Sequence, residues 1–162
     1  MTPRKFNQLV DETADRLYRF ALSLLANTAD AQDVVQDAFE RFWARRDTVQ
    51  ASKASSYLFT TVHNGCMDHF RKLRRVSDSP LPEIEAAVDV RQRAPDLNTI
   101  LHQALDTLPP VQRSVLLLRD YEGYSYAEIA SICDLSLGQV KVYIHRGRRA
   151  MQAQLGAIEN VI

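Results

Sequence analysis

The chain has 162 residues, of which 46% are apolar and 25% are charged, a composition typical of soluble globular proteins. Lys and Arg balance Asp and Glu at 20 each, so the net charge alone does not indicate a nucleic-acid binder. Only five glycines and six prolines disfavour disorder and a turn-rich all-β fold. The two cysteines indicate no disulfide framework, and no apolar run reaches the ~18 residues that span a bilayer. We therefore expect a soluble, cytoplasmic protein.

The charge is spread unevenly along the chain. Residues 1–75 carry 12 Lys/Arg against 9 Asp/Glu, whereas residues 76–96 carry 2 against 5 and contain three prolines. Apolar residues elsewhere recur at helical spacing, and no segment of note has the period of a strand. The sequence predicts an all-α protein with two small helical domains, 1–75 and 97–162, joined by a flexible linker over 76–96, with a helix-turn-helix in the second domain.

Three helices are predicted in the first domain. A strongly amphipathic helix from about Phe6 to Leu24 ends at a break at Asn27-Thr28. A second helix from about Asp30 to Arg46 follows, and a polar loop over residues 47–56 leads to a third helix over 57–75. The third helix has an apolar stripe that should face the core: Phe59, Val62, Cys66, Phe70 and Leu73. A polar stripe lies roughly opposite: Tyr57, Thr60, Thr61, Asn64, Asp68, Arg71 and Arg75.

Two helix-start signatures stand eleven residues apart in the second domain. Ser125 with Glu128, and Ser136 with Gln139, each have the spacing of a capping box, in which two side chains satisfy unpaired backbone donors. They predict a short helix, a tight turn and a second helix, the arrangement that places its second helix in a DNA major groove. The last helix should bury one stripe: Leu137, Val140, Ile144, Gly147, Met151 and Leu155. Residues 136–151 contain four cations and no acid: Lys141, Arg146, Arg148 and Arg149.

Taken alone, this pattern also fits an αα-hairpin with a solvated basic end. The order of motifs along the chain resembles a known family, the bacterial extracytoplasmic-function sigma factors of the sigma-70 family. Segments of the second domain are similar to that family's C-terminal domain: Leu108–Arg113, Tyr121–Ala130, Ser136–Lys141 and Arg146–Arg149. Segments of the first domain are similar to its polymerase-binding and promoter-melting helices: Asp30–Phe39 with Trp43, and Tyr57–Asn64 with Asp68 and Arg71-Lys72.

The resemblance implies a transcription initiation factor rather than an enzyme, with no cofactor. It implies contacts to the −35 promoter element from Ser136, Gln139, Lys141, Val142, Tyr143, His145, Arg146 and Arg149. Contacts to the −10 element, as it opens, would come from Lys53, Tyr57, Thr60, Asn64, Asp68, Arg71 and Lys72. The clamp helices of the largest RNA polymerase subunit would bind Asp33, Gln36, Asp37, Glu40 and Trp43. The implied partners are core RNA polymerase, including its flap, promoter DNA and an anti-sigma factor.

Four residues depart from the family pattern: Thr61, His63, Asp134 and Val142. Asp134 should still permit the turn, since aspartate tolerates a left-handed backbone, whereas Val142 leaves the −35 sequence open. His63, Cys66 and His69 have a spacing that invites a metal hypothesis. It is disfavoured because positions six apart on a helix point about 120° away from each other, and Cys66 lies on the core stripe.

Two rival functions remain open at this point. A helix-turn-helix regulator would bind DNA without polymerase and would use residues 1–75 for dimerisation or ligand sensing. The polar stripe of the third helix disfavours that function, because a dimer face is ordinarily more apolar. An interaction protein with two basic helices would instead bind acidic partners, with little dependence on salt.

Overall fold

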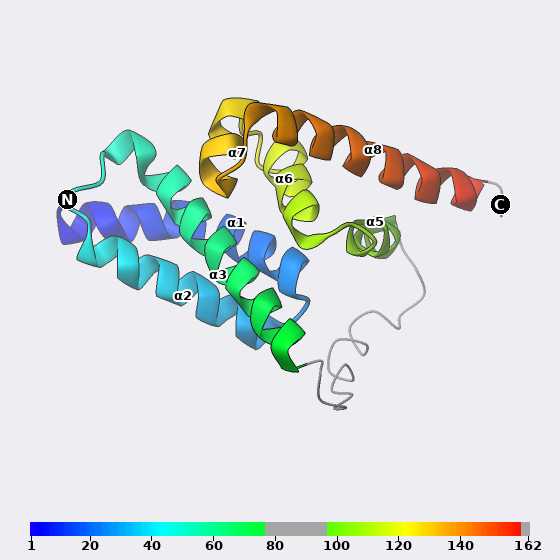
Figure 1. The fold of residues 1–162 in the computed structure, drawn as a ribbon. Coiled ribbons are helices and arrows are strands. Elements are labelled where there is room, and N and C mark those ends of the chain that lie inside the picture. The colour runs from blue at the N-terminus through cyan, green and yellow to red at the C-terminus, as the bar shows by residue number, and fades with distance from the viewer. Residues whose placement is uncertain (77–96, 160–162) are drawn as a thin grey trace.

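A computed structural model of the protein describes residues 1–76 and 97–159, and nearly all of the regular structure in these ranges is α-helical (Figure 1). The all-α prediction is confirmed for this part of the chain. The predicted linker lies outside the described residues except for Val76, which ends a long helix. No helix in these ranges is long and apolar enough to cross a membrane.

The described residues form two groups of helices, here called the first half (1–76) and the second half (97–159). The first half contains α1 (Pro3–Leu25), α2 (Thr28–Ala44), a 3-10 turn (Ala51–Lys53) and α3 (Ala54–Val76). The second half contains α5 (Leu97–Asp106), α6 (Pro110–Asp120), α7 (Tyr126–Cys133) and α8 (Leu137–Glu159).

Side-chain caps determine where the first helices begin. The Thr2 hydroxyl accepts a hydrogen bond from the backbone N–H of Lys5 at 3.2 Å, and Pro3 occupies the first turn of α1. The Asn27 side chain accepts from the N–H of Asp30 at 3.0 Å, so α2 starts at Thr28, two residues earlier than predicted. The predicted polar loop is also shorter than 47–56, since α3 already begins at Ala54.

The first half has a core made by one face of each of its three long helices. Leu17 and Phe20 of α1 and Phe42 of α2 are almost completely buried. On α3 the predicted core stripe is confirmed at Phe59, Val62 and Cys66, all fully buried. The prediction is wrong for Leu73, which is 53% exposed. This residue lies in the last turns of α3, where residues 71–75 are all exposed and extend past the packed part of the helix.

Helix α6 is the centre of the second half. Its residues 113–118 are all buried, which is typical of a helix that is covered on every side. Helix α8 crosses it closely at Gly147, where an added Cβ would lie only 3.1 Å from Leu116 Cδ2. The absence of a side chain at this position therefore allows the two helices to approach each other.

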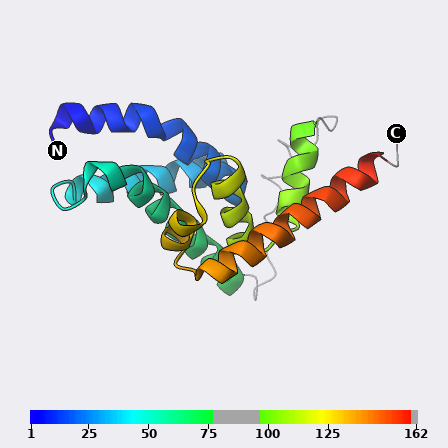
Figure 2. The same ribbon diagram turned by 90° about the horizontal axis from the view of Figure 1, so that it is seen from above.

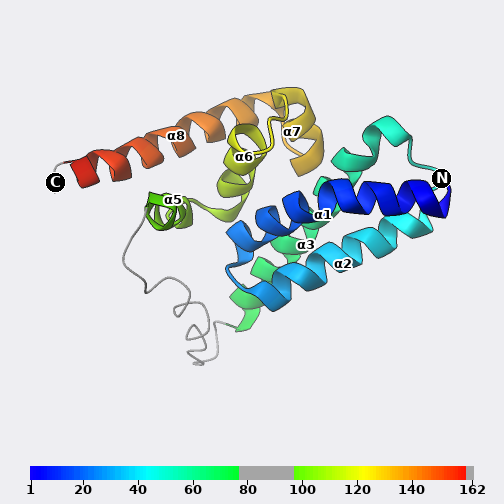
Figure 3. The same cartoon turned by 180° about the vertical axis from the view of Figure 1, so that it is seen from behind.

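The two halves pack directly against each other through α6 and α7 on one side and α1 and α3 on the other (Figure 3). Phe59 of α3 contacts Tyr124 edge-to-face, with ring centroids 5.4 Å apart. Arg16 Nε of α1 lies 2.8 Å from Glu122 Oε2, and the Glu122 side chain is 7% exposed. Helix α8 extends away from the first half toward its C-terminal end (Figure 2).

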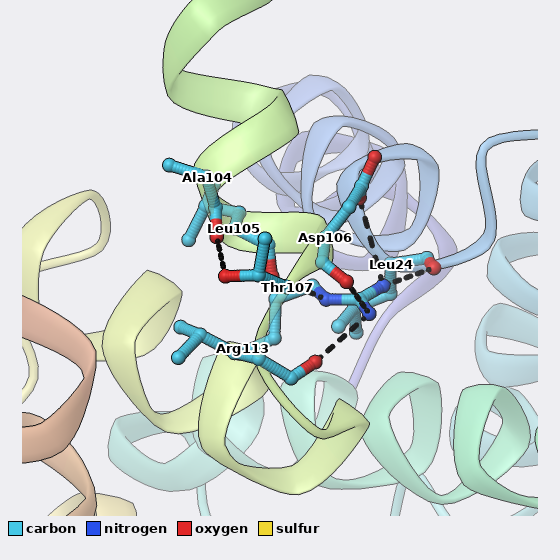
Figure 4. A network of polar contacts seen from close by, with 7 residues as sticks. Leu24, Ala104, Leu105, Asp106, Thr107 and Arg113 are labelled. Carbon is cyan, nitrogen blue, oxygen red and sulfur yellow. Dashed lines mark hydrogen bonds and ion pairs between the residues drawn. The ribbon is translucent and has the colours of Figure 1, made fainter. Parts of the chain in front are cut away.

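Arg113 is a charged residue that is nearly buried, at 9% exposure, and it joins both halves (Figure 4). Its guanidinium donates to the carbonyls of Leu105 at 3.0 Å and Leu108 at 3.1 Å, and more weakly to that of Asp106 at 3.4 Å. It also donates to the carbonyl of Leu24, at the end of α1, at 3.1 Å. Five N–H donors in a fixed plane suit this task, because several carbonyls at helix ends lack partners within their own helix.

We expect Arg113→Met to lower the free energy of unfolding by about 2–4 kcal/mol, because it leaves several buried carbonyls without a donor. Urea denaturation followed by circular dichroism measures the change. Arg19→Met is the matched control, since Arg19 is exposed, and it should stay within about 0.5 kcal/mol of the wild type. Equal stability of the two variants would contradict the structural role of Arg113.

Candidate nucleic-acid and protein interfaces

Helices α7 and α8 form a helix-turn-helix in which both predicted capping boxes are present. Ser125 and Glu128 exchange two hydrogen bonds of 3.1 Å each at the start of α7. Ser136 and Gln139 repeat the arrangement at the start of α8, with bonds of 2.9 and 3.1 Å. Asp134 makes the turn between them with φ 55°, so the prediction of a left-handed residue there is confirmed.

The exposed surface of α8 carries nearly all the residues expected to contact the −35 element. Seven of these side chains are exposed: Ser136, Gln139, Lys141, Val142, His145, Arg146 and Arg149. Tyr143 is half-buried. Arg148 pairs with Asp120 of α6 at 2.7 Å but stays about half exposed, so Lys141, Arg146, Arg148 and Arg149 all reach solvent. Leu137 was predicted to face inward but is 47% exposed, because it is the first residue of the helix and precedes the packed turns.

The exposed face of α3 carries most of the residues expected at the −10 element. Lys53, Asn64, Asp68, Arg71 and Lys72 are exposed. Two other residues of this set, Thr60 and Tyr57, already make contacts within the protein. The Thr60 hydroxyl donates to the carbonyl of Ser56 at 2.8 Å, and the half-buried Tyr57 ring packs edge-to-face on Phe42 at 5.8 Å.

Asn64 and Asp68 differ in what their side chains contact. Asp68 pairs with Arg71 one turn away, at 3.0 Å. Within the described part of the chain, the Asn64 side chain forms no hydrogen bond. An exposed amide can both donate and accept, so Asn64 is the polar group on this face best able to bind a ligand edge.

The five residues expected to bind polymerase all lie on α2, next to an apolar groove. Four are exposed and acidic or amide in character: Asp33, Gln36, Asp37 and Glu40. The Trp43 ring packs on Phe6 of α1, with centroids 4.8 Å apart. Gln36, Glu40 and Trp43 also line a groove of about 770 Å³ between α1 and α2, whose walls include Phe6 and Phe39. An apolar groove with a charged rim can receive a helix from a partner.

His63 is fully enclosed where the two halves meet, and sequence reasoning did not place it there. It is 3% exposed, its Nδ1 lies 2.6 Å from Ser114 Oγ of α6, and Cys133 Sγ of α7 is 3.9 Å away. Burial lowers the pKa of His63 to about 4, so the ring is neutral in the packed protein. In the sequence, His63 was marked only as one of the four departures from the family pattern.

The three side chains of the metal hypothesis have separate surroundings. His63 contacts Ser114, whereas His69 Nε2 pairs with Asp30 Oδ2 at 3.1 Å. Cys66 is in the core, where burial raises the pKa of its thiol to about 12. Among the described residues, no group of three or more His, Cys, Asp or Glu side chains has the geometry of a metal site.

We expect His63→Gln to reduce the acid sensitivity of the fold. Unfolding returns the His63 pKa to about 6.5, so its stability contribution is full above pH 6.5 and is lost as the pH falls toward 4. Between pH 7 and pH 5 the wild type loses about 2 kcal/mol of its free energy of unfolding through this effect. Gln does not titrate in this range, so the variant does not lose it. Urea unfolding at the two pH values measures the difference. Replacing the exposed His145 by Gln should leave the wild-type dependence in place, and an unchanged dependence in His63→Gln would refute the assignment.

Both halves match family models of bacterial transcription factors. Residues 9–76 match the model described as Sigma-70 region 2, and residues 98–151 match Sigma-70, region 4. The chain is 33% identical to the RNA polymerase sigma-E factor of Streptomyces coelicolor, over 94% of this chain and 87% of that protein. It is 34% identical to the ECF RNA polymerase sigma factor SigE of Mycolicibacterium smegmatis, over 93% of this chain but only 61% of the length of that relative.

Two solved structures share the arrangement of helices. One is the sigma factor RpoE in complex with the anti-sigma factor NepR from Bartonella quintana, with a TM-score of 0.77 at 28% identity, covering 94% of this chain and 98% of that one. The other is CnrH in complex with the cytosolic domain of CnrY, with a TM-score of 0.70 at 27% identity, covering 96% and 90%.

Proposed function

Because this chain belongs to the extracytoplasmic-function sigma factors of the sigma-70 family, we propose that it binds core RNA polymerase and directs it to promoters. In this proposal residues 1–75 act as region 2 and residues 97–162 as region 4. The observation that carries it is the presence in one chain of two separate helices, α3 and α8, that each expose polar and basic side chains. The protein acts in the cytoplasm through binding energy, with no covalent catalysis.

Helix α8 is proposed to enter the major groove of the −35 element. The turns nearest its N-terminus, with Gln139 and Val142, face base edges, and the later Arg146 and Arg149 reach phosphates. The absence of acids between residues 136 and 151 supports this orientation, since nothing on that stretch repels the DNA backbone.

Helix α3 is proposed to engage the −10 element during strand opening. An extruded base offers hydrogen-bonding edges and a stacking face, which suit the Asn64 amide and the Tyr57 ring. Arg71 and Lys72, both exposed, would hold the adjacent phosphates. The exposed part of α3 thus combines base recognition with a sequence-independent attraction.

Polymerase is proposed to bind each half. The clamp helices of the largest subunit would contact the α2 residues Asp33, Gln36, Asp37, Glu40 and Trp43 along the apolar groove. A second groove of about 330 Å³, between α5, α6 and α8, is available for the flap. Its apolar lining includes Leu105, Leu116, Met151 and Leu155.

The packed arrangement of the halves must open for both promoter elements to be bound together. Elements centred at −10 and −35 are about 85 Å apart along duplex DNA, given a rise of about 3.4 Å per base pair. Helices α3 and α7 are in direct contact, and α7 packs on α8. We therefore infer that the packed form precedes promoter binding. One of the similar solved structures is a sigma factor in complex with an anti-sigma factor, and a protein of that kind is the proposed inhibitor here.

A helix-turn-helix regulator that binds DNA without polymerase is the alternative. The α2 groove and the exposed polar face of α3 disfavour it, because a regulator of that type has no use for a second DNA-facing helix. It predicts that the purified chain alone binds a palindromic site with high affinity.

The proposed function predicts that the chain converts core polymerase into a promoter-specific enzyme. Purified core enzyme is incubated with the chain and genomic DNA fragments, and transcripts are mapped at their 5′ ends. Defined start sites that depend on the chain, preceded by a shared pair of elements, are expected. Failure to initiate at any fragment, combined with tight binding of the chain alone to a palindrome, would favour the regulator instead.

Asn64→Ala should impair promoter opening while sparing polymerase binding. Loss of one good base contact corresponds to about 1–3 kcal/mol, or roughly 5- to 150-fold in the formation of open complexes. Permanganate reactivity of unpaired thymines reports opening, and co-purification with core enzyme reports binding. Ser23→Ala, at a half-buried position on α1 away from this face, is the control. Normal opening in Asn64→Ala would leave Asn64 as an ordinary surface residue.

A further inference from the structure

Three exposed side chains share the outward face of the first turns of α8. Gln139, Val142 and Arg146 are separated by three and four residues, so they lie one above another on the same side of the helix. None of them belongs to the buried stripe, which includes Val140 and Ile144. This face therefore presents one amide, one apolar group and one cation, in that order from the N-terminus of the helix.

The amide of Gln139 has a fixed orientation because it takes part in the helix cap. The backbone N–H of Ser136 donates to Gln139 Oε1 at 2.9 Å, and a donor N–H requires the oxygen rather than the nitrogen of the amide. The N–H of Gln139 in turn donates to Ser136 Oγ at 3.1 Å. The oxygen is thus held by the protein, and the NH₂ group is left to interact with an outside partner.

This orientation limits what Gln139 can recognise. A glutamine that reads adenine does so with both atoms, accepting from N6 and donating to N7. With one lone pair of its oxygen used in the cap and both N–H groups of its amide free, Gln139 is mainly a donor to an outside partner. Acceptors that a lone donor can reach in the major groove are O6 and N7 of guanine, N7 of adenine and O4 of thymine, whereas cytosine presents none.

Val142 is an apolar side chain that is partly exposed to water on this face of α8. It is 45% exposed, and a β-branched residue is also a modest helix former. Its two methyl groups are stiff about χ1, so the apolar surface is presented in one orientation. The one apolar group on the floor of the major groove is the 5-methyl of thymine.

The geometry points to a division of −35 recognition between these two residues. Val142 selects a thymine through its methyl group, and Gln139 donates to a base with a major-groove acceptor (guanine, adenine or thymine) at another position of the element, which excludes cytosine there. Arg146 contributes affinity through phosphate without selecting a base. This inference rests on the proposed function, and it assigns the specificity of the same surface.

The Val142 contact can be tested by removing one methyl group from the DNA. Holoenzyme, made from the full chain and core polymerase, is first used to select a −35 sequence from a random library. Each thymine of the selected element is then replaced by deoxyuridine, which lacks only the 5-methyl. We expect one position to lose affinity by about fourfold, the effect of burying one methyl-sized group. In Val142→Ser the same replacement should have no effect.

The Gln139 contact can be tested with a substitution that keeps the cap. Glu128 makes the same bond in the first box, accepting from the N–H of Ser125 at 3.1 Å, so Gln139→Glu retains an acceptor for Ser136 and removes the donor. Selection with this variant should change one position from guanine, adenine or thymine to cytosine, whose N4 group donates to a carboxylate. Arg146→Ala is the matched control, which should weaken binding to every sequence without changing the preferred bases.

The outcomes separate this inference from the proposed function. If holoenzyme initiates from selected promoters but no thymine shows a methyl effect, or the effect persists in Val142→Ser, the role of Val142 is refuted. A cytosine preferred by the wild-type chain at the position changed by Gln139→Glu, or no change at any position, refutes the donor role of Gln139. If no sequence is selected and no initiation occurs, the proposed function itself fails.

Discussion

The ring of Phe59 is in contact with both halves of the molecule, and the rest of the packing is organised around it. The ring is fully buried, lies edge-to-face with Phe20 at 5.5 Å in its own half, and meets Tyr124 at 5.4 Å in the other. The guanidinium of Arg16 lies 5.3 Å from its centroid and pairs with Glu122. One apolar ring thus stabilises a domain core and the contact between domains, and a cation bound to it adds a charged link. If the halves separate, this apolar surface meets water, so the packed form is favoured until a partner replaces Tyr124.

Helix α3 serves two purposes because its faces are chemically different. One side buries Phe59, Val62 and His63, and the second half covers it. The other side exposes Asn64 and Asp68 even when the halves are packed. Packing therefore leaves the proposed −10 surface open and instead prevents α3 and α8, the two helices proposed to face DNA, from reaching sites far apart on a duplex. A partner that controls this protein would then change the distance between the exposed faces of α3 and α8, while each face keeps the same exposed residues.

Local signals in the sequence predicted local structure well. Both capping boxes, the left-handed Asp134 and the apolar stripe of α3 depend on neighbours within a few residues, and each is present. Periodicity failed at helix ends, where Leu73 and Leu137 continue a stripe that no longer has anything to pack against. It could not reveal Arg113 or His63, whose partners lie far away in the chain. In the sequence, Arg113 and His63 have the polar character of surface residues. Their burial depends on partners that only the fold brings near, Leu24 for Arg113 and Ser114 for His63. The roles of the surface residues at the −10, −35 and polymerase surfaces stay predictions.

The hydrogen bonds of Arg113 are divided unequally between the two halves, and this affects what is lost when the halves separate. Of the four carbonyls that it contacts in the described part of the chain, three belong to the second half, and only that of Leu24 belongs to the first. Parting the halves therefore breaks that bond and the contact of the guanidinium with the Phe70 ring of α3, 5.9 Å from its centroid, while the three carbonyls of the second half still accept from Arg113. In the proposed exchange between inhibitor and polymerase, the second half therefore keeps most of the network around Arg113, and separation of the halves requires breaking buried contacts such as Phe59–Tyr124 and His63–Ser114.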